Sequence, residues 1–250
     1  MKDIRDTTLT ATCPTALAHY ETALAQFQSY TGDPIATLDA ALAVDPGFAL
    51  ASLFKAFALF TTSEQRYLPL VRESIDAAAR EEARLTDRER GLLAAARALA
   101  DGRWTAGRRA LDRVLVEHPR DALALQTGHL MDFYTGDALN LRNRVARVLP
   151  AWSESTPGYA YVLGMHAFGL EECNQYAEAE QTARRALALQ PRDGWAVHAA
   201  AHVMEMQGRI DEGIAWLTSR QADWAVEGNA FAPHNLWHLA LFHLDGGNHD

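Results

Sequence analysis

The chain has 250 residues, of which 48% are apolar and 22% are charged, a composition typical of a packed soluble protein and not of a disordered one. Its 23 basic and 32 acidic residues give a formal net charge of −9. This charge, and the absence of any run of five basic residues, argue against a nucleic-acid or an anionic membrane partner.

The sequence shows neither a targeting segment nor a cysteine motif. The first twenty residues lack the apolar core of a signal peptide, and no stretch reaches the roughly 18 apolar residues of a membrane-spanning helix. We therefore expect a cytoplasmic protein. Cys13 and Cys173 are too few for a disulfide framework or a CxxC metal site, so we expect two reduced thiols.

Helical patterns follow one another from end to end. Ala, Leu, Arg and Glu dominate and β-branched runs are absent, so we expect no strands. The periodicity predicts helices over residues 14–30, 34–44, 47–61, 65–81, 86–100, 104–117, 121–135, 138–151, 157–173, 176–189, 193–206, 210–223 and 231–245.

The turn signals between these helices recur at near-constant spacing. They fall at residues 32, 64, 102, 136, 174, 208 and 247. Pro119 and Pro191 each lie 17 residues after the preceding turn position, where a tetratricopeptide repeat carries its proline. The sequence therefore predicts an all-α fold, a right-handed superhelix of antiparallel helical hairpins that forms one domain over residues 1–250.

Two histidine pairs carry most of the functional signal. His198 and His202 lie four residues apart, as do His234 and His238, and residues at i and i+4 share one face of a helix. Seven of the ten histidines fall in the last 85 residues. In a tetratricopeptide repeat the first helix of each hairpin lines the concave surface, and its groove-facing positions lie at fixed offsets before the turn residue.

This register assigns the candidate ligand-binding residues, within a histidine-rich groove region over residues 157–250. Counted back from Gly208 and Gly247, the groove positions hold His198, His202 and His234, and His238 lies one position off this stripe. His129 and His166 fall at core positions instead. The predicted ligand-binding residues are Trp195, His198, His202, Glu205, His234, Trp237 and His238.

Three interpretations of the histidine cluster remain open at this point. It is a hydrogen-bonded polar layer inside the superhelix, or a pocket for a peptide or small ligand with Trp195 and Trp237 as an aromatic wall, or a site for a divalent metal ion. The candidate metal ligands are His198, His202, Glu205, His234 and His238. No glutamate adjoins His198 as an HExxH motif requires, so zinc-protease chemistry is disfavoured.

Three other features lead to less specific expectations. Glu171 and Glu172 are adjacent and point about 100° apart on a helix, so we expect a solvated helix end and not an acid–base pair. The long connection around residues 225–231 is a candidate flap over the groove. Lys2 and Lys55 are the only lysines, so a lysine clamp for a peptide carboxylate lacks its residues.

Several segments together resemble the tetratricopeptide repeat protein 38 family. They are TDRERGLLAAARAL, VLVEHPRDALAL, FGLEECNQYAEAE and, most specifically, WAVHAAAHVMEMQGRIDEGIAWL and HNLWHLALFHLDGG. The resemblance implies the repeat fold. It matches Trp195, His198, His202, Glu205 and Met206 to the family's first histidine motif, and His234, Asn235, Trp237 and His238 to its second. Family members look longer, so we expect this chain to be the N-terminal part of such a protein.

The function expected from these observations is a helical-repeat binding or scaffold protein. Its histidine and tryptophan pocket would take a peptide or small ligand, and the alternative is an enzyme that uses the same cluster for metal-assisted or acid–base chemistry. A divalent metal is a possible cofactor. The final helix is expected to expose an apolar face, with Leu236, Leu239, Ala240 and Phe242, through which the chain would self-associate.

Overall fold

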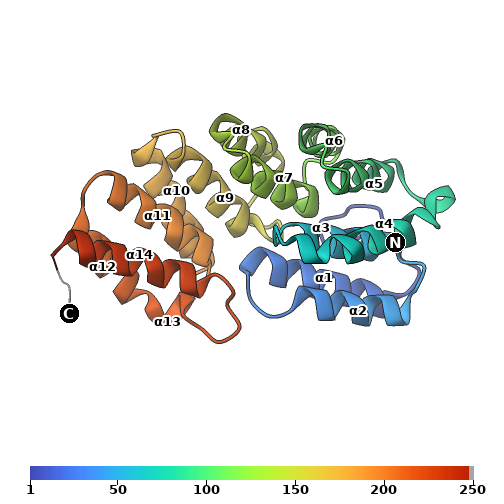
Figure 1. Cartoon of the computed structure of the whole chain (residues 1–250), viewed down its shortest axis with the longest axis horizontal. Helices are drawn as coiled ribbons and strands as arrows, with labels where there is room; N and C mark the ends of the chain where they lie inside the picture. Colours follow the sequence, from blue (N-terminus) through green and yellow to red (C-terminus); the bar gives the residue numbers. More distant parts are fainter. Residues whose placement is uncertain (248–250) are drawn as a thin grey trace. The chain divides into compact units, whose positions relative to one another are not determined.

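The computed structural model describes residues 1–247, and these residues are almost entirely helical (Figure 1). They contain no β-strand, only isolated bridges between Lys2 and Thr8 and between Thr31 and Asn229. The α-helices are α1 Pro14–Ser29, α2 Pro34–Val44, α3 Ala49–Phe60, α4 Leu68–Ala79, α5 Asp87–Ala100, α6 Trp104–Glu117, α7 Ala122–Tyr134, α8 Ala138–Val148, α9 Tyr159–Glu171, α10 Tyr176–Leu189, α11 Gly194–Met206, α12 Ile210–Ser219, α13 Gln221–Trp224 and α14 Ala232–Asp245. Short 3₁₀ helices occupy Gln65–Tyr67, Glu82–Arg84 and Leu149–Ala151.

The turns that the sequence predicts share one backbone geometry. Each of the seven contains a residue with positive φ, five of them glycine, one Asn174 and one Ser63. At four of the turns the amide of the residue that follows the positive-φ residue donates to the carbonyl five residues earlier, as Arg103 does to Ala98 and Arg209 to Met204. This is the Schellman arrangement, which ends a helix in a left-handed residue. The repeat in the sequence therefore corresponds to a repeated helix termination.

Aspartate and threonine side chains set where several helices begin. Asp33, Asp121 and Asp193 accept hydrogen bonds from the first free amides of α2, α7 and α11. Thr86 and Glu89 form a reciprocal capping box at α5. These caps satisfy amides that have no partner within the helix. They therefore fix the first residue of each helix, which the periodicity alone does not determine.

Two predicted helices begin or end differently in the structure. The helix expected over 65–81 starts as a 3₁₀ turn and becomes α4 only at Leu68. The helix expected over 210–223 breaks at Arg220, whose φ of −106° and ψ of 6° separate α12 from α13. The break folds the fully buried Trp224 back onto α12, where its indole N–H donates to the Leu217 carbonyl at 3.1 Å. Tertiary packing of one large aromatic ring overrides the helical periodicity here.

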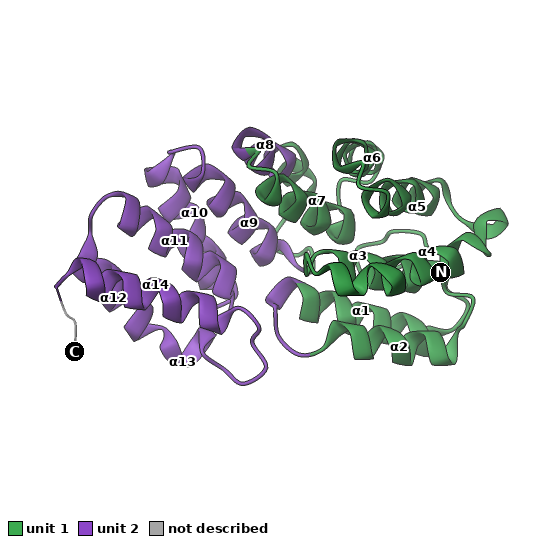
Figure 2. Cartoon of the chain, in the orientation of Figure 1, with its two compact units in different colours: residues 1–27, 33–137, 147–157 green, residues 28–32, 138–146, 158–250 purple. Residues whose placement is uncertain are grey.

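The described helices form two compact units (Figure 2). The first comprises residues 1–27, 33–137 and 147–157, and the second residues 28–32, 138–146 and 158–250, of which 248–250 lie outside the described residues. In the first unit each helix from α2 to α7 packs on the next, and α3 also packs on α5 and α7. The single domain expected over residues 1–250 stays a prediction.

The second unit continues the hairpin pattern and holds both histidine pairs. Its helices α9 to α12 pack in chain order, and the first helices of successive hairpins also meet, α9 with α11 and α11 with α14. Alanine fills the layer between them, since Ala196, Ala199, Ala200 and Ala201 are fully buried. Small side chains let α11 approach its neighbours closely, and its larger residues then project toward α9 and α14. All-helical hairpins stacked in this way form an α-solenoid.

The apolar face expected on α14 is only partly exposed. Phe242 is 1% exposed, because its ring packs against Gly213, where an added Cβ would lie 2.3 Å from it. The prediction that Phe242 belongs to an open face is therefore wrong. Leu236 and Leu244 are 43% and 54% exposed, and self-association through them stays a prediction. Among the described residues, no helix is both long and apolar enough to cross a lipid bilayer.

Candidate functional site

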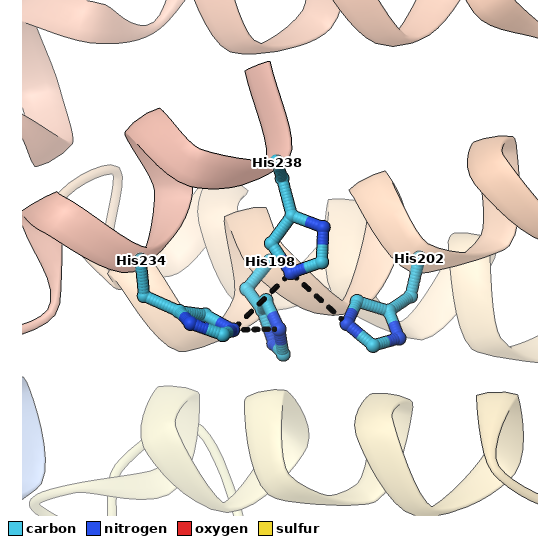
Figure 3. Close-up of side chains that lie close together, drawn as sticks. All are labelled: His198, His202, His234 and His238. Atoms are coloured by element: carbon cyan, nitrogen blue, oxygen red, sulfur yellow. Dashed lines mark hydrogen bonds between the residues drawn. The ribbon is translucent and has the colours of Figure 1, made fainter. Parts of the chain in front are cut away.

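Four imidazole rings from two neighbouring helices converge in the second unit (Figure 3). Helix α11 supplies His198 and His202, and α14 supplies His234 and His238. The Nε2 atoms of His198 and His234 are 3.0 Å apart, those of His234 and His238 are 3.2 Å apart, and those of His238 and His202 are 3.2 Å apart. One ring nitrogen from each histidine lies within 4.8 Å of the other three. The i, i+4 spacing on each helix thus produces one cluster of donor atoms.

Three of the six separations between these nitrogens are close to those in the first coordination shell of a metal ion. A tetrahedral zinc site has Zn–N distances of about 2.0–2.1 Å, which places neighbouring ligand nitrogens roughly 3.3 Å apart. The three short contacts in the cluster, at 3.0 to 3.2 Å, are close to that value. Neutral imidazole is also a good ligand for zinc, copper, iron and nickel.

Hydrogen bonds within the cluster cannot account for all of these contacts. A ring nitrogen of a neutral histidine carries either a hydrogen or a lone pair, so it forms one hydrogen bond in the ring plane. The Nε2 atoms of His234 and His238 each have two Nε2 neighbours. At most two of the three contacts are therefore hydrogen bonds, and the interpretation as a polar layer leaves one contact unexplained.

Carboxylates lie behind two of the four rings. Nδ1 of His238 donates to Oε2 of Glu205 at 3.0 Å, which leaves the lone pair of His238 on Nε2, inside the cluster. Nδ1 of His202 lies 3.5 Å from Oε2 of Glu171. Pairing of a metal-bound histidine with a carboxylate is common in metal sites, because it fixes the tautomer and makes the ring a stronger donor.

Glu171 corrects an expectation from the sequence. We expected a solvated helix end at Glu171 and Glu172, but Glu171 is 5% exposed, and its Oε2 has no hydrogen-bond partner among the described residues. Helix α9 packs against α11, and His202 of α11 lies beside the Glu171 carboxylate. Glu172 is less buried. Burial, and to a lesser extent repulsion from Glu171, raises the pKa of its carboxyl group.

Burial keeps three of the rings neutral. Burial, together with repulsion from His202, lowers the pKa of His198 well below its ordinary value and the pKa of His238 to about 3. The same causes lower the pKa of His234. Desolvation penalises the charged imidazolium form, so these rings keep a free lone pair near neutral pH, which is the form that binds a metal.

Aromatic side chains enclose the buried side of the cluster. The Phe231 ring lies 5.1 Å from the His198 ring and 5.0 Å from the His234 ring, and the Phe168 ring lies 5.2 Å from the His198 ring. His198 itself is 2% exposed, and its Nδ1 has no hydrogen-bond partner among the described residues. His202 and His234 are partly exposed, so solvent reaches the cluster from their side.

The two predicted wall tryptophans differ in exposure. Trp195 lies 5.5 Å from the His198 ring, but it is 6% exposed and stacks on Tyr30 at 5.5 Å. Tyr30 and Phe231 cover Trp195, so it lies in the buried part of the aromatic surroundings, and its role in ligand binding stays a prediction. Trp237 is 54% exposed and stacks on the His234 ring at 5.6 Å.

The segment expected to be a flap is held in place within the second unit. The amide of Gly32 donates to the Gly228 carbonyl at 2.9 Å, and the amide of Ala230 donates to the Tyr30 carbonyl at 2.8 Å. Asn229 is buried and donates to the Trp224 carbonyl at 2.8 Å. These bonds position Phe231 against the histidines. No pattern in the sequence links residues 28–32 to residues 228–231, so this contact could not be predicted from the sequence.

His129, His166 and His243 do not belong to the group of converging ring nitrogens. His129 on α7 is fully buried, in agreement with its predicted core position. His166 on α9 is partly buried, and burial and the nearby Arg142 lower its pKa. His243, near the end of α14, is partly buried. His249, for which the sequence supports no assignment, lies outside the described residues.

Comparison with known proteins finds a structural match but no family model. No protein-family model matches the sequence. Among solved structures, the crystal structure of the TPR domain of P58(IPK) matches 94% of this chain and 90% of that chain, with 13% sequence identity and a TM-score of 0.29. At this similarity the match carries no argument about function. The repeat fold of the present chain rests on its own helices and turns.

Proposed function

We propose that this helical-repeat protein is a metal-binding protein, and that its second unit holds one divalent transition-metal ion through His198, His202, His234 and His238. The observation that carries the proposal is the convergence of four ring nitrogens within 4.8 Å of one another. An ion among them removes the contact that hydrogen bonding leaves unexplained, since all four lone pairs can then point inward.

The donor set favours ion binding over the alternative of an enzyme. Four imidazoles complete the tetrahedral shell that zinc adopts in structural sites, whereas catalytic zinc keeps a position open for water. The surroundings are equally consistent with ion binding, because aromatic rings bury one side and carboxylates stand behind His202 and His238. A peptide or small ligand of the kind expected from the sequence would contact the exposed Trp237 beside this site.

Membership of the tetratricopeptide repeat protein 38 family is part of the same proposal. It rests on the resemblance of the two histidine segments, which are also the segments that meet at the cluster. Since no family model matches the chain, the resemblance is the whole support for this assignment, and metal binding does not depend on it.

Elemental analysis of the purified, chelator-washed and zinc-reloaded protein tests the proposal. We expect stoichiometric zinc in the parent and none in a His198→Ala/His202→Ala variant. His166→Ala is the matched control, since His166 lies on α9 outside the cluster, and it should load like the parent. Circular dichroism checks that the variants remain helical. Equal zinc contents in the parent and the double variant would contradict the proposal.

A further inference from the structure

The buried carboxylate of Glu171 has a role that neither the fold nor metal binding by itself assigns. Glu171 is the last residue of α9, and its side chain is 6% exposed. Burying a carboxylate without a hydrogen-bond donor costs free energy, so an unpaired buried oxygen calls for a functional explanation. The outward nitrogen of His202 is 3.5 Å from Oε2 of Glu171.

Glu205 provides an internal comparison. It stands behind His238 as Glu171 stands behind His202, and its bond to Nδ1 of His238 is already formed at 3.0 Å. The two carboxylates come from different helices, α9 and α11. Each one faces the nitrogen of its histidine that points away from the cluster.

The pair of carboxylates has a consequence for the contact between His202 and His238. If both rings carry their hydrogen on Nδ1, both Nε2 atoms present lone pairs to each other at 3.2 Å. Two facing lone pairs repel each other unless a cation lies between them. The outer carboxylates therefore favour the arrangement that only a bound cation makes stable.

We propose that Glu171 is a positioning residue of the metal site. It accepts a hydrogen bond from Nδ1 of His202, holds that ring with its Nε2 lone pair toward the ion, and connects α9 to a site whose ligands come from α11 and α14. Together with Glu205 it also balances the charge of a divalent ion bound by four neutral rings. This inference rests on the proposed metal-binding function.

The adjacent glutamate supplies a matched control for the test. Glu171→Gln and Glu172→Gln change carboxylates at neighbouring positions of one helix end. Oε2 of Glu171 lies 3.5 Å from Nδ1 of His202, whereas a carboxylate oxygen of Glu172 lies within 4.8 Å of a His202 ring nitrogen without an ion pair to it. Zinc affinity is measured by competition with a chromophoric chelator, and the cobalt-loaded proteins are compared by visible absorption. We expect Glu171→Gln to weaken zinc binding by about 10- to 100-fold and to change the cobalt spectrum, and Glu172→Gln to leave both close to the parent.

A second measurement needs no variant. Histidine ring ¹H–¹⁵N correlation spectra of the zinc-loaded parent report which nitrogen of His202 carries the hydrogen. We expect the hydrogen on Nδ1, as for His238. This result would support the proposal even if Glu171→Gln failed to fold, which thermal unfolding of the metal-free variants would reveal.

Three outcomes would overturn the positioning role while leaving the metal site intact. They are parent-like zinc affinity in Glu171→Gln, equal weakening in both glutamine variants, and two ions per parent chain with one lost in Glu171→Gln, which would make the carboxylate a ligand. A parent that binds no zinc, or a His198→Ala/His202→Ala variant that binds it as tightly as the parent, would instead overturn metal binding and the positioning role together.

Discussion

At the scale of single residues, the sequence predicts some contacts of the candidate site and not others. The pairing of His198 with His202 and of His234 with His238 follows from helical spacing, because i and i+4 side chains share a face. The contact between Glu171 and His202 joins residues on separate helices 31 positions apart. No periodicity encodes such a contact, so it could be found only from the packing of α9 on α11.

Asp193 shows how one residue links the start of α11 to the stability of the fold. Its Oδ1 accepts from the amides of Trp195 and Ala196 at 3.1 Å, and its Oδ2 is buried without a hydrogen-bond partner among the described residues. Gly164 leaves room for the carboxyl group, since an added Cβ would lie 2.6 Å from Oδ2. Burial raises the pKa of Asp193 to about 7.

This pKa predicts a pH-dependent stability with a definite sign. An aspartate in the unfolded chain has a pKa of about 3.9, so between about pH 4 and pH 7 the folded state binds more protons at Asp193. The free energy of unfolding contributed by this group therefore falls as the pH rises through that window. Asn caps helices as well as Asp does and does not ionise, so Asp193→Asn should remove the effect.

Denaturant unfolding of the parent and Asp193→Asn between pH 4 and pH 8 checks this prediction. The variant should gain stability relative to the parent as the pH rises to about 7 and then level off, by about 1.4 kcal/mol for each unit of pKa difference. The comparison cancels the titration of groups common to both proteins. A difference that stays constant across the range would show that Asp193 has an ordinary pKa.

At the scale of helices, turn chemistry carries most of the predictable information. The spaced Gly, Asn and Ser positions predicted the helix ends, and every one of these turns has a residue with positive φ. The break at Arg220 was not predictable, because it depends on where the Trp224 ring is buried.

The register of α14 was predicted with His238 off the stripe, yet His238 is 2% exposed and central to the cluster. Packing of Asn235, His238 and Phe242 against its neighbours sets the rotation of this helix.

The close approach of two helix backbones also affects the stability of the protein, and the sequence gives no sign of it. Gly169 lies where α9 meets α8, and an added Cβ would lie 2.6 Å from the Cα atom of Arg142 and 2.9 Å from the Leu141 carbonyl oxygen. Backbone atoms cannot move aside as a flexible side chain can. We expect Gly169→Ala to destabilise the protein by about 1–3 kcal/mol, measured by denaturant unfolding.

Gly194 provides the control for this substitution. It is the first residue of α11, and an added Cβ there would meet no atom closer than 3.5 Å. Alanine is the better helix former, so Gly194→Ala should be neutral or mildly stabilising. Equal effects of the two substitutions would mean that the α8–α9 contact is looser than described.

At the scale of the molecule, the solenoid brings distant segments together without a long-range pattern in the sequence. Each hairpin packs on the next, so the first helices α9, α11 and α14 succeed one another, and the proposed metal site draws on all three. The site lies wholly within the second unit, and the first unit supplies none of its residues. Ion binding should therefore stabilise the folded second unit by mass action.

X-ray absorption at the zinc edge of the stoichiometrically loaded protein tests the central claim most directly. A four-histidine site predicts a first shell of four nitrogen neighbours at about 2.0–2.1 Å, with the multiple-scattering pattern of imidazole rings and no sulfur. A shell made mainly of oxygen atoms, or one that contains sulfur from Cys13 or Cys173, would contradict the account. It would place the ion at other residues and leave the histidine cluster as a polar layer.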